Sequence, residues 1–442
     1  MKFLFLIYLF TFLNALAVNA FQQESIKQLV TGAQHSCVVF QSGKVKCWGN
    51  NNFGQLGLGD VEVRGDEANE MGARLPYVNL GNNLEVDHLT AGHNHTCAFF
   101  RTGQIKCWGA NNMGQLGLGD RNPRGKTPEE MGDALPFVDL GTNQQVKKLS
   151  SKGNHNCVSF EDGALKCWGW NNFGQLGIGH LSTIGDEPNE MGGALSYTTL
   201  GLNEKIREIY TGYQHSCALL ESKKIKCWGY AGSGRLGLGD NKSRGDTPDE
   251  MGDALPILDL GSGFEIKSLS IAIPSCALTT QGRMKCWGAN SYGELGIGDS
   301  TSRGTKLTDM GDALAHVDLG FNQEVIEISA GSGGVCAVLA NQTAKCWGRN
   351  GSGQLGLGDR EARGDNPGEM GENLQPIYLG RRQPILHVEV SEEFTCALLG
   401  TRTQNAVKCW GRNGLGQLGV GDRRERGAQP SEMGDNLPYV EL

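Results

Sequence analysis

The chain has 442 residues, with 40 lysines and arginines against 48 aspartates and glutamates, for a formal net charge of −8. An acidic chain lacks the basic surface that displaces counterions from nucleic acid, so we expect no nucleic-acid partner. Glycine supplies 66 residues, which is typical of a protein with many turns that need positive φ.

Residues 1–20 have the pattern of a secretory signal peptide. Lys2 precedes an apolar run that extends from Phe3 to Phe12 and beyond, and Val18-Asn19-Ala20 supplies small residues for cleavage. The alternative is a membrane anchor, but the apolar core is short of the ~20 residues that a spanning helix needs. No later stretch reaches membrane length, so we expect a soluble, secreted protein without a membrane span.

Fourteen cysteines form seven pairs that recur every 59 or 60 residues, and tryptophan follows the second member of each pair. An even number of regularly spaced cysteines behind a signal peptide indicates disulfide bonds formed in the secretory pathway. The pairs are Cys37 with Cys47, Cys97 with Cys107, Cys157 with Cys167, Cys217 with Cys227, Cys276 with Cys286, Cys336 with Cys346, and Cys396 with Cys409.

Each copy is expected to contain four short β-strands joined by glycine-rich turns. In the second copy the clearest strands are 96–100, 104–108 and 135–141. One such sheet cannot bury both of its faces, whereas seven sheets packed radially can. The sequence therefore predicts an all-β, seven-bladed β-propeller that forms one domain over residues 21–442. The copies span approximately 22–81, 82–141, 142–201, 202–261, 262–320, 321–380 and 381–442.

The ends of the chain suggest how the ring closes. A linear solenoid is the alternative architecture, but it needs atypical polar end copies, and the first and last copies here look ordinary. The chain enters at one strand type, 26–30, and stops in another, 439–442, and inside the chain these two types follow one another. We expect the N- and C-terminal strands to complete one blade together.

The cysteine spacing fits a β-hairpin. If Cys37 lies opposite Cys47, then Val38 lies opposite Lys46 and residues 41–43 form the loop. Opposed residues in an antiparallel pair have Cα atoms ~4.5 Å apart, which a disulfide tolerates. The seventh copy keeps this register with three more residues in its loop. Free cysteines or metal ligands are the alternatives, but zinc sites use shorter cysteine spacings.

The segments Cys47–Gly59, Cys107–Gly119 and Cys346–Gly358 read Cys-Trp-Gly-x-Asn-x-x-Gly-Gln-Leu-Gly-x-Gly. This pattern, with Gly212–Leu220, resembles the repeat of the regulator of chromosome condensation family. The resemblance covers all seven copies and implies a seven-bladed propeller. The founding member of that family exchanges guanine nucleotide on a small GTPase. Against exchange here stand the signal peptide, the disulfides and the near-constant period, which leaves no room for an inserted wedge.

Seven lysines occupy equivalent positions one residue before the second cysteine of each pair. A cationic ring for an anionic ligand is one interpretation. The other is pairing of each lysine with a carboxylate of its own copy, such as Asp60 or Glu70. The lysines are Lys46, Lys106, Lys166, Lys226, Lys285, Lys345 and Lys408.

Histidines precede the first cysteine by two residues in four consecutive copies, at His35, His95, His155 and His215. Equivalent positions in neighbouring blades lie about 10 Å apart, too far for one metal ion, so we expect these histidines to stabilise turns. We predict no metal site and no cofactor, although the acidic loops of the copies leave calcium binding open. The fifth copy departs most from the repeat, at 271–275, and is where we expect asymmetry.

Four sequons offer glycosylation sites at Asn94, Asn241, Asn341 and Asn350. Arg-Gly-Asp occurs at 64–66, 244–246 and 363–365. These tripeptides occupy a slot of the repeat, so we expect a structural role for them.

The sequence contains no recognisable catalytic motif. We expect a secreted, monomeric, non-catalytic module that binds an unidentified protein partner. A multivalent glycan-binding protein is the first alternative, and a guanine-nucleotide exchange factor is the second, by resemblance.

Overall fold

The computed structural model describes residues 24–381, 383–401 and 404–442. The predicted signal peptide, residues 1–20, lies outside this range.

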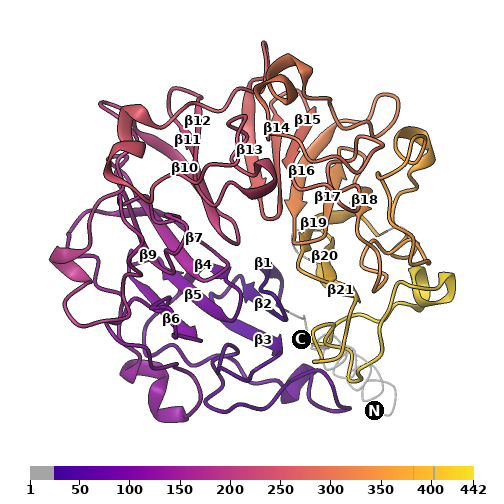
Figure 1. Ribbon diagram of the computed structural model, residues 1–442. Helices are drawn as coiled ribbons and strands as arrows, with labels where there is room; N and C mark the ends of the chain where they lie inside the picture. Colours follow the sequence, from indigo (N-terminus) through magenta and orange to yellow (C-terminus); the bar gives the residue numbers. More distant parts are fainter. Residues whose placement is uncertain (1–23, 382, 402–403) are drawn as a thin grey trace, which may run out of the picture.

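Seven three-stranded antiparallel sheets surround a central axis (Figure 1). Each sheet, or blade, takes its strands from one sequence copy, which confirms the predicted all-β propeller with seven blades. The strands are β1 (Ile26–Thr31), β2 (His35–Phe40), β3 (Val45–Gly49), β4 (Val86–Ala91), β5 (His95–Phe100), β6 (Ile105–Gly109), β7 (Val146–Lys152), β8 (His155–Phe160), β9 (Leu165–Gly169), β10 (Ile206–Thr211), β11 (His215–Leu220), β12 (Ile225–Gly229), β13 (Ile266–Ile271), β14 (Pro274–Thr279), β15 (Met284–Gly288), β16 (Val325–Ala330), β17 (Gly334–Leu339), β18 (Ala344–Gly348), β19 (Ile385–Val390), β20 (Phe394–Gly400) and β21 (Asn405–Gly411).

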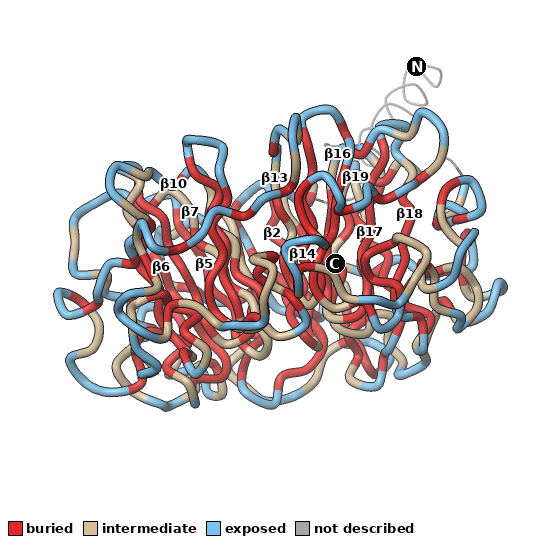
Figure 2. The backbone as a smooth tube through the Cα atoms, turned by 45° about the horizontal axis from the view of Figure 1, so that its top comes forward, coloured by how far each residue is buried: buried red, intermediate tan, exposed pale blue. Residues whose placement is uncertain are grey.

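Short 3₁₀ helices interrupt the loops between the blades' third strands and the next copies. In the described residues they are η1 (Gly72–Arg74), η2 (Pro128–Glu130), η3 (Gly132–Ala134), η4 (Gly192–Ala194), η5 (Gly232–Gly234), η6 (Pro248–Glu250), η7 (Gly252–Ala254), η8 (Leu307–Asp309), η9 (Gly311–Ala313), η10 (Gly371–Asn373), η11 (Pro430–Glu432) and η12 (Gly434–Asn436). The strands carry the buried residues, and the exposed ones lie mainly on the loops at both faces of the ring (Figure 2).

The expected fourth strand of each copy is only partly a strand. It lies along the outer edge of its sheet and is joined to the third strand by a backbone hydrogen bond, such as that from Val78 N to Val45 O at 2.9 Å. An isolated bridge forms only in blades three and five of the described chain, at Tyr197 and His316. The other five copies carry a proline in this segment, and proline fits poorly into a β-ladder.

The predicted sharing of one blade by the two chain ends is wrong. The last segment lies on β21 of its own copy, where Val440 N donates to Val407 O at 2.8 Å. A copy begins at an inner strand and ends at its own outer segment, so it already contains a whole blade. Blades seven and one meet through a buried cluster that includes Leu29, Trp48 and Leu398, and through hydrogen bonds such as that from Gly72 N to Glu441 O at 3.0 Å.

The same contacts recur at each boundary between blades. Trp108 Nε1 donates to Gln55 O of the preceding blade at 3.0 Å, and Trp48 Nε1 donates to Gln417 O at 3.1 Å where the ring closes. Gly57 lies against the Trp108 ring with φ of 69°, and a Cβ there would stand 2.7 Å from the indole nitrogen. The Cys-Trp-Gly and Gly-Gln-Leu-Gly motifs are therefore the two sides of a joint between blades.

All fourteen cysteines form disulfides within the hairpins, in the predicted register. Cys37 lies opposite Cys47 with Cα atoms 4.1 Å apart, and Val38 lies opposite Lys46. The longer hairpin of blade seven keeps the same spacing, because Cys396 and Cys409 also have Cα atoms 4.1 Å apart. The seven bonds join Cys37 to Cys47, Cys97 to Cys107, Cys157 to Cys167, Cys217 to Cys227, Cys276 to Cys286, Cys336 to Cys346, and Cys396 to Cys409.

The disulfides are buried at the joints between blades. Each packs in a cluster with the tryptophan of the next blade, as Cys37 and Cys47 do with Trp108. The bonds thus stiffen the surface on which the next blade sits. Free cysteines and cysteine metal ligands, the two alternatives, are excluded for the described chain.

Candidate functional site: the turn face and the central channel

The seven lysines are not brought together at one site. Lys106 Nζ donates to Leu80 O of the preceding blade at 2.9 Å and to Gly132 O of its own blade at 2.8 Å. Lys226, Lys285, Lys345 and Lys408 repeat this double contact, while Lys46 and Lys166 each bind one carbonyl. Burial lowers the pKa of these ammonium groups. The lysines are buried clamps between the blades rather than a ring facing a ligand.

The predicted lysine partners, Asp60 and Glu70, are engaged elsewhere. Asp60 forms an ion pair with Arg64 at 2.6 Å, and Glu70 accepts hydrogen bonds from the backbone of Gly65 and Asp66. Asp66 is buried, at the boundary with blade seven, against Arg423. This Arg-Gly-Asp slot is therefore part of the scaffold.

The four histidines join each blade to the next one. His35 Nε2 lies 2.9 Å from Thr96 Oγ1, which itself donates to Gln55 O, so the imidazole must donate. His95, His155 and His215 make the equivalent contacts with Asn156, Ser216 and Ser275. Burial lowers the pKa of His35, His155 and His215 to about 3 and that of His95 to about 4. The four imidazoles are neutral, and they join neighbouring blades to one another and do not bind a metal.

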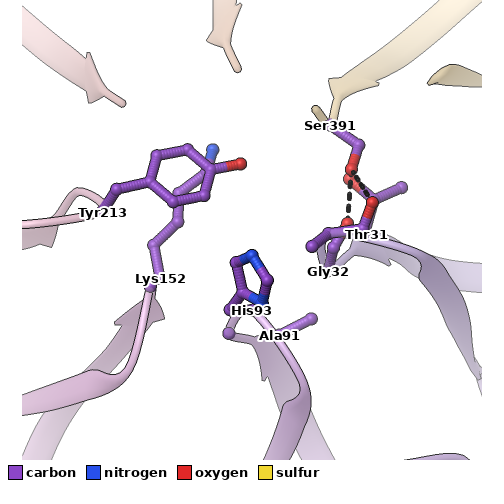
Figure 3. Close-up of a pocket in the computed structure, with 10 residues that line it drawn as sticks. Thr31, Gly32, Ala91, His93, Lys152, Tyr213 and Ser391 are labelled. Atoms are coloured by element: carbon purple, nitrogen blue, oxygen red, sulfur yellow. Dashed lines mark hydrogen bonds between the residues drawn. The ribbon is translucent and has the colours of Figure 1, made fainter. Parts of the chain in front are cut away.

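The turns that join the first and second strand of each blade define what we call the turn face. These turns close the central channel at that end. Ala33 N donates to His93 O at 3.2 Å, and Ser391 Oγ donates to Ala33 O at 3.1 Å. The side chains of His93, Lys152 and Tyr213 fill the centre (Figure 3), and Lys152 Nζ donates to Ala330 O across the ring at 2.8 Å.

A cavity of about 250 Å³ lies behind these central side chains, between the first strands of the blades. His387 stands on its wall between Glu327, at 2.6 Å, and Glu389, at 2.9 Å. Burial opposes protonation of His387, but these hydrogen bonds outweigh it and hold its pKa well above the usual value. An imidazolium held by two carboxylates is a poor general base. Within the described residues, no group of three or more His, Cys, Asp or Glu side chains could hold a metal ion.

The hydroxyl groups of the cavity are also engaged. Ser270 Oγ and Ser329 Oγ accept hydrogen bonds from Ala330 N and Val390 N of neighbouring blades, at 2.9 and 3.0 Å. They therefore satisfy the edges of the inner strands, and neither of them is paired with a general base as a nucleophile would be.

The side chains that differ between copies gather on the turn face. The residue after each Trp-Gly lies there, and in six blades its amide donates to the turn, as Tyr230 N does to Gln214 O at 2.9 Å. This position is Asn50, Ala110, Trp170, Tyr230, Ala289, Arg349 and Arg412. Three residues after it stand Phe53, Met113, Phe173, Ser233, Tyr292, Ser352 and Leu415.

Aromatic rings and arginines are the chemistry of this surface. Phe173 packs against Trp170 of its own blade and Tyr230 of the next, with centroids 5.4 and 4.7 Å apart. The Arg349 guanidinium lies over Tyr292 at 5.6 Å. Sequence reasoning missed these residues and looked to the fifth copy instead; the available signal was variation beside the repeated Trp-Gly.

The four sequons differ in accessibility. Asn241 and Asn341 are exposed, and Asn94 is half-buried on the turn face. Asn350 is 1 % exposed, and its amide nitrogen donates to Asp359 O at 3.0 Å. Glycan attachment at Asn350 would displace this hydrogen bond, so the folded protein does not offer that site.

In the described part of the chain, no helix is long and apolar enough to cross a membrane. The family model described as the RCC1-like domain matches residues 13–381. Among curated proteins, the ultraviolet-B receptor UVR8 of Arabidopsis thaliana is 27% identical over 350 residues, 77% of this chain and 69% of that protein. A protein RCC2 homolog of Xenopus laevis is 26% identical over 371 residues, covering 78% of this chain and 64% of its own length.

Solved structures share the fold at low identity. Prp20p of Saccharomyces cerevisiae superposes with a TM-score of 0.62 at 20% identity, covering 84% of this chain and 81% of its own. Human WBSCR16 gives a TM-score of 0.64 at 16% identity, with 86% and 88% covered. These likenesses concern the fold alone.

Proposed function

Because the chain belongs to the RCC1-like domain family, we propose that it is a secreted, non-catalytic propeller that binds another protein through its turn face. The observation that carries this proposal is the distribution of variation. The joint residues between blades repeat from copy to copy, whereas the two variable positions of the turn face carry a different pair of side chains on each blade. A surface that is free of the repeat's packing demands can be shaped to one partner.

The composition of the turn face supports a protein partner. Tyrosine, tryptophan and arginine are enriched where protein interfaces have their largest energetic contributions. The structure of Prp20p was reported with its binding properties to Gsp1p and histones, so a propeller of this family can bind proteins. The alternative of several equal glycan sites finds less support, because the seven turn-face positions are not alike.

Secretion is supported by the seven disulfides, since such bonds persist in oxidising compartments. The same bonds argue against the alternative of nucleotide exchange on a GTPase, which takes place in a reducing compartment. Absence of catalysis is supported by the hydrogen bonds and ion pairs that the ionisable side chains in the channel already make.

The test begins with affinity capture of the tagged protein from native secretions, with chemical cross-linking and mass spectrometry. Hydrogen–deuterium exchange on the isolated complex then locates the contact. We expect protection at the turn-face segments 32–34, 92–94 and 212–214. Protection confined to the opposite loops, such as 41–43 and 101–103, would contradict the chosen face. Recovery of the full-length protein in the cytosol would contradict secretion.

A further inference from the structure

Blade four departs from the repeat at two positions that fix the turn-face loop in the other blades. In six copies an Asn side chain accepts from a Leu amide, as Asn51 Oδ1 does from Leu56 N at 3.0 Å. A Gln or Glu side chain caps the same loop. In blade one, Gln55 Oε1 accepts a hydrogen bond from Phe53 N at 2.9 Å. Blade four has Ala231 and Arg235 there, and neither side chain has an acceptor.

The loop of blade four is held by a substitute contact. Asn241 Oδ1 accepts from Gly234 N at 3.1 Å, and Ser233 adopts φ of 59°, which is uncommon for a residue other than glycine. Arg235 therefore cannot make the cap that Gln or Glu makes in the other copies. The cap that this position supplies in the other copies does not explain the presence of Arg235.

Arg235 is partly buried and under-used as a hydrogen-bond donor. Its Nη1 donates to Gln214 Oε1 at 3.0 Å, while the buried Nε has no partner. In the described structure no carboxylate lies within ion-pair distance, whereas Arg349 and Arg412, on the same face, both reach Glu393. Burial lowers the pKa of Arg235, and no carboxylate among the described residues offsets the cost of burying its positive charge. Its guanidinium lies 5.1 Å from the centre of the Tyr230 ring.

Three aromatic rings continue from this cation. Tyr230 contacts Phe173, and Phe173 contacts Trp170. Seven of the eight tryptophans are fully buried in the joints between blades, and Trp170 is the one outside that slot. We call Trp170, Phe173, Tyr230 and Arg235 the blade-four site.

We infer that the blade-four site is an anchor for an Asp or Glu side chain that the protein partner presents among apolar residues. The inference rests on the proposed function and adds the partner's chemistry to it. A guanidinium with unused donors matches a planar carboxylate, and the adjoining rings exclude water from the contact. The partner's carboxylate would supply the negative charge that Arg235 lacks in the free protein.

Phage-displayed peptides selected on the immobilised, oxidised protein give a probe of defined chemistry. Wild-type protein should enrich peptides with Asp or Glu beside apolar residues. Each selected peptide is then compared with its Asn or Gln twin, using Trp170 fluorescence to follow binding. We expect the acidic peptide to bind about tenfold or more tightly than its twin, since hydrogen bonds to charged groups are the stronger ones.

Arg235→Gln is the decisive variant, because it installs the residue that most other copies carry and should leave thermal stability intact. It should abolish the preference for the acidic peptide. Arg101→Gln, an exposed arginine on the opposite face, should leave that preference unchanged. Trp170→Phe should remove the fluorescence change on binding, because the other seven tryptophans are fully buried in the joints between blades.

Peptides bound without an acidic preference, or bound equally by Arg235→Gln, would overturn the inference while leaving the proposed function in place. Failure of wild-type protein to enrich any peptide, with binding to sialylated or uronic acid glycans on an array, would overturn both. The two ideas therefore fail in distinguishable ways.

Discussion

Replacement of a clamp lysine decides between a structural and a ligand-binding role for all seven. In Lys345→Met the side chain keeps its apolar stem and loses its ammonium group, so Leu319 O and Gly371 O lose donors now at 2.8 and 2.9 Å. Hydrogen bonds from a charged donor contribute about 1.5–3 kcal/mol each, and relief of ammonium desolvation offsets part of this. We expect a net loss of about 2–4 kcal/mol of unfolding free energy.

The corresponding thermal shift follows from chain size. An unfolding entropy of about 2.1 cal/mol/K per residue gives about 0.9 kcal/mol/K for some 420 residues, so Tm should fall by about 2–5 °C. Differential scanning calorimetry of the oxidised protein measures it. Lys46→Met, which removes one carbonyl contact, should lose less. Exposed Lys242→Met should lose nothing. If Lys345→Met melts like the wild type, the clamp is not structural and a ligand role returns.

Three further outcomes follow from the joints between blades. The four buried histidines have folded pKa values below the unfolded value, so stability is fully present above about pH 7 and falls as acid protonates the unfolded chain; between pH 7 and 5 each costs about 2 kcal/mol. Thermal melts across that range should show a steep acid loss that His215→Gln reduces, and a flat profile would refute the assignment. Ser300→Arg should raise Tm by giving Asp365 the partner that Arg121 gives Asp186, while Ser300→Gln should not. Non-reducing peptide mapping should find seven disulfides, each inside one blade and each stabilising by about 2–3 kcal/mol; bonds between blades would contradict the hairpin register.

The fold was accessible from the sequence because its evidence is local. The spacing of Cys37 and Cys47 fixes a hairpin register, and repetition multiplies that evidence seven times. Ring closure was not accessible. The order of strands along the chain does not say whether segment 439–442 pairs with its own copy or with the first. The deciding contact is the backbone hydrogen bond from Val440 N to Val407 O, which residue identity does not specify.

The candidate site escaped prediction for a related reason. Phe173 and Tyr230 belong to different copies, and only the joint between blades three and four brings their rings within 4.7 Å. The carboxylate partners expected for the lysines differ from the carbonyl partners observed, because a side chain one residue from a cysteine gives no sign of the carbonyls above and below it. Carbonyl acceptors leave no trace in residue identity, unlike the carboxylates that were expected as partners.

Every disulfide of the structure stays inside a blade, and this has a mechanical consequence. The disulfides cross-link each of the seven blades internally, whereas the side-chain contacts between neighbouring blades are non-covalent all round the ring. Six boundaries are also spanned by backbone, and the one between blades seven and one is not. Under tension the ring should open first between blades seven and one, and each blade should remain folded after the ring has opened.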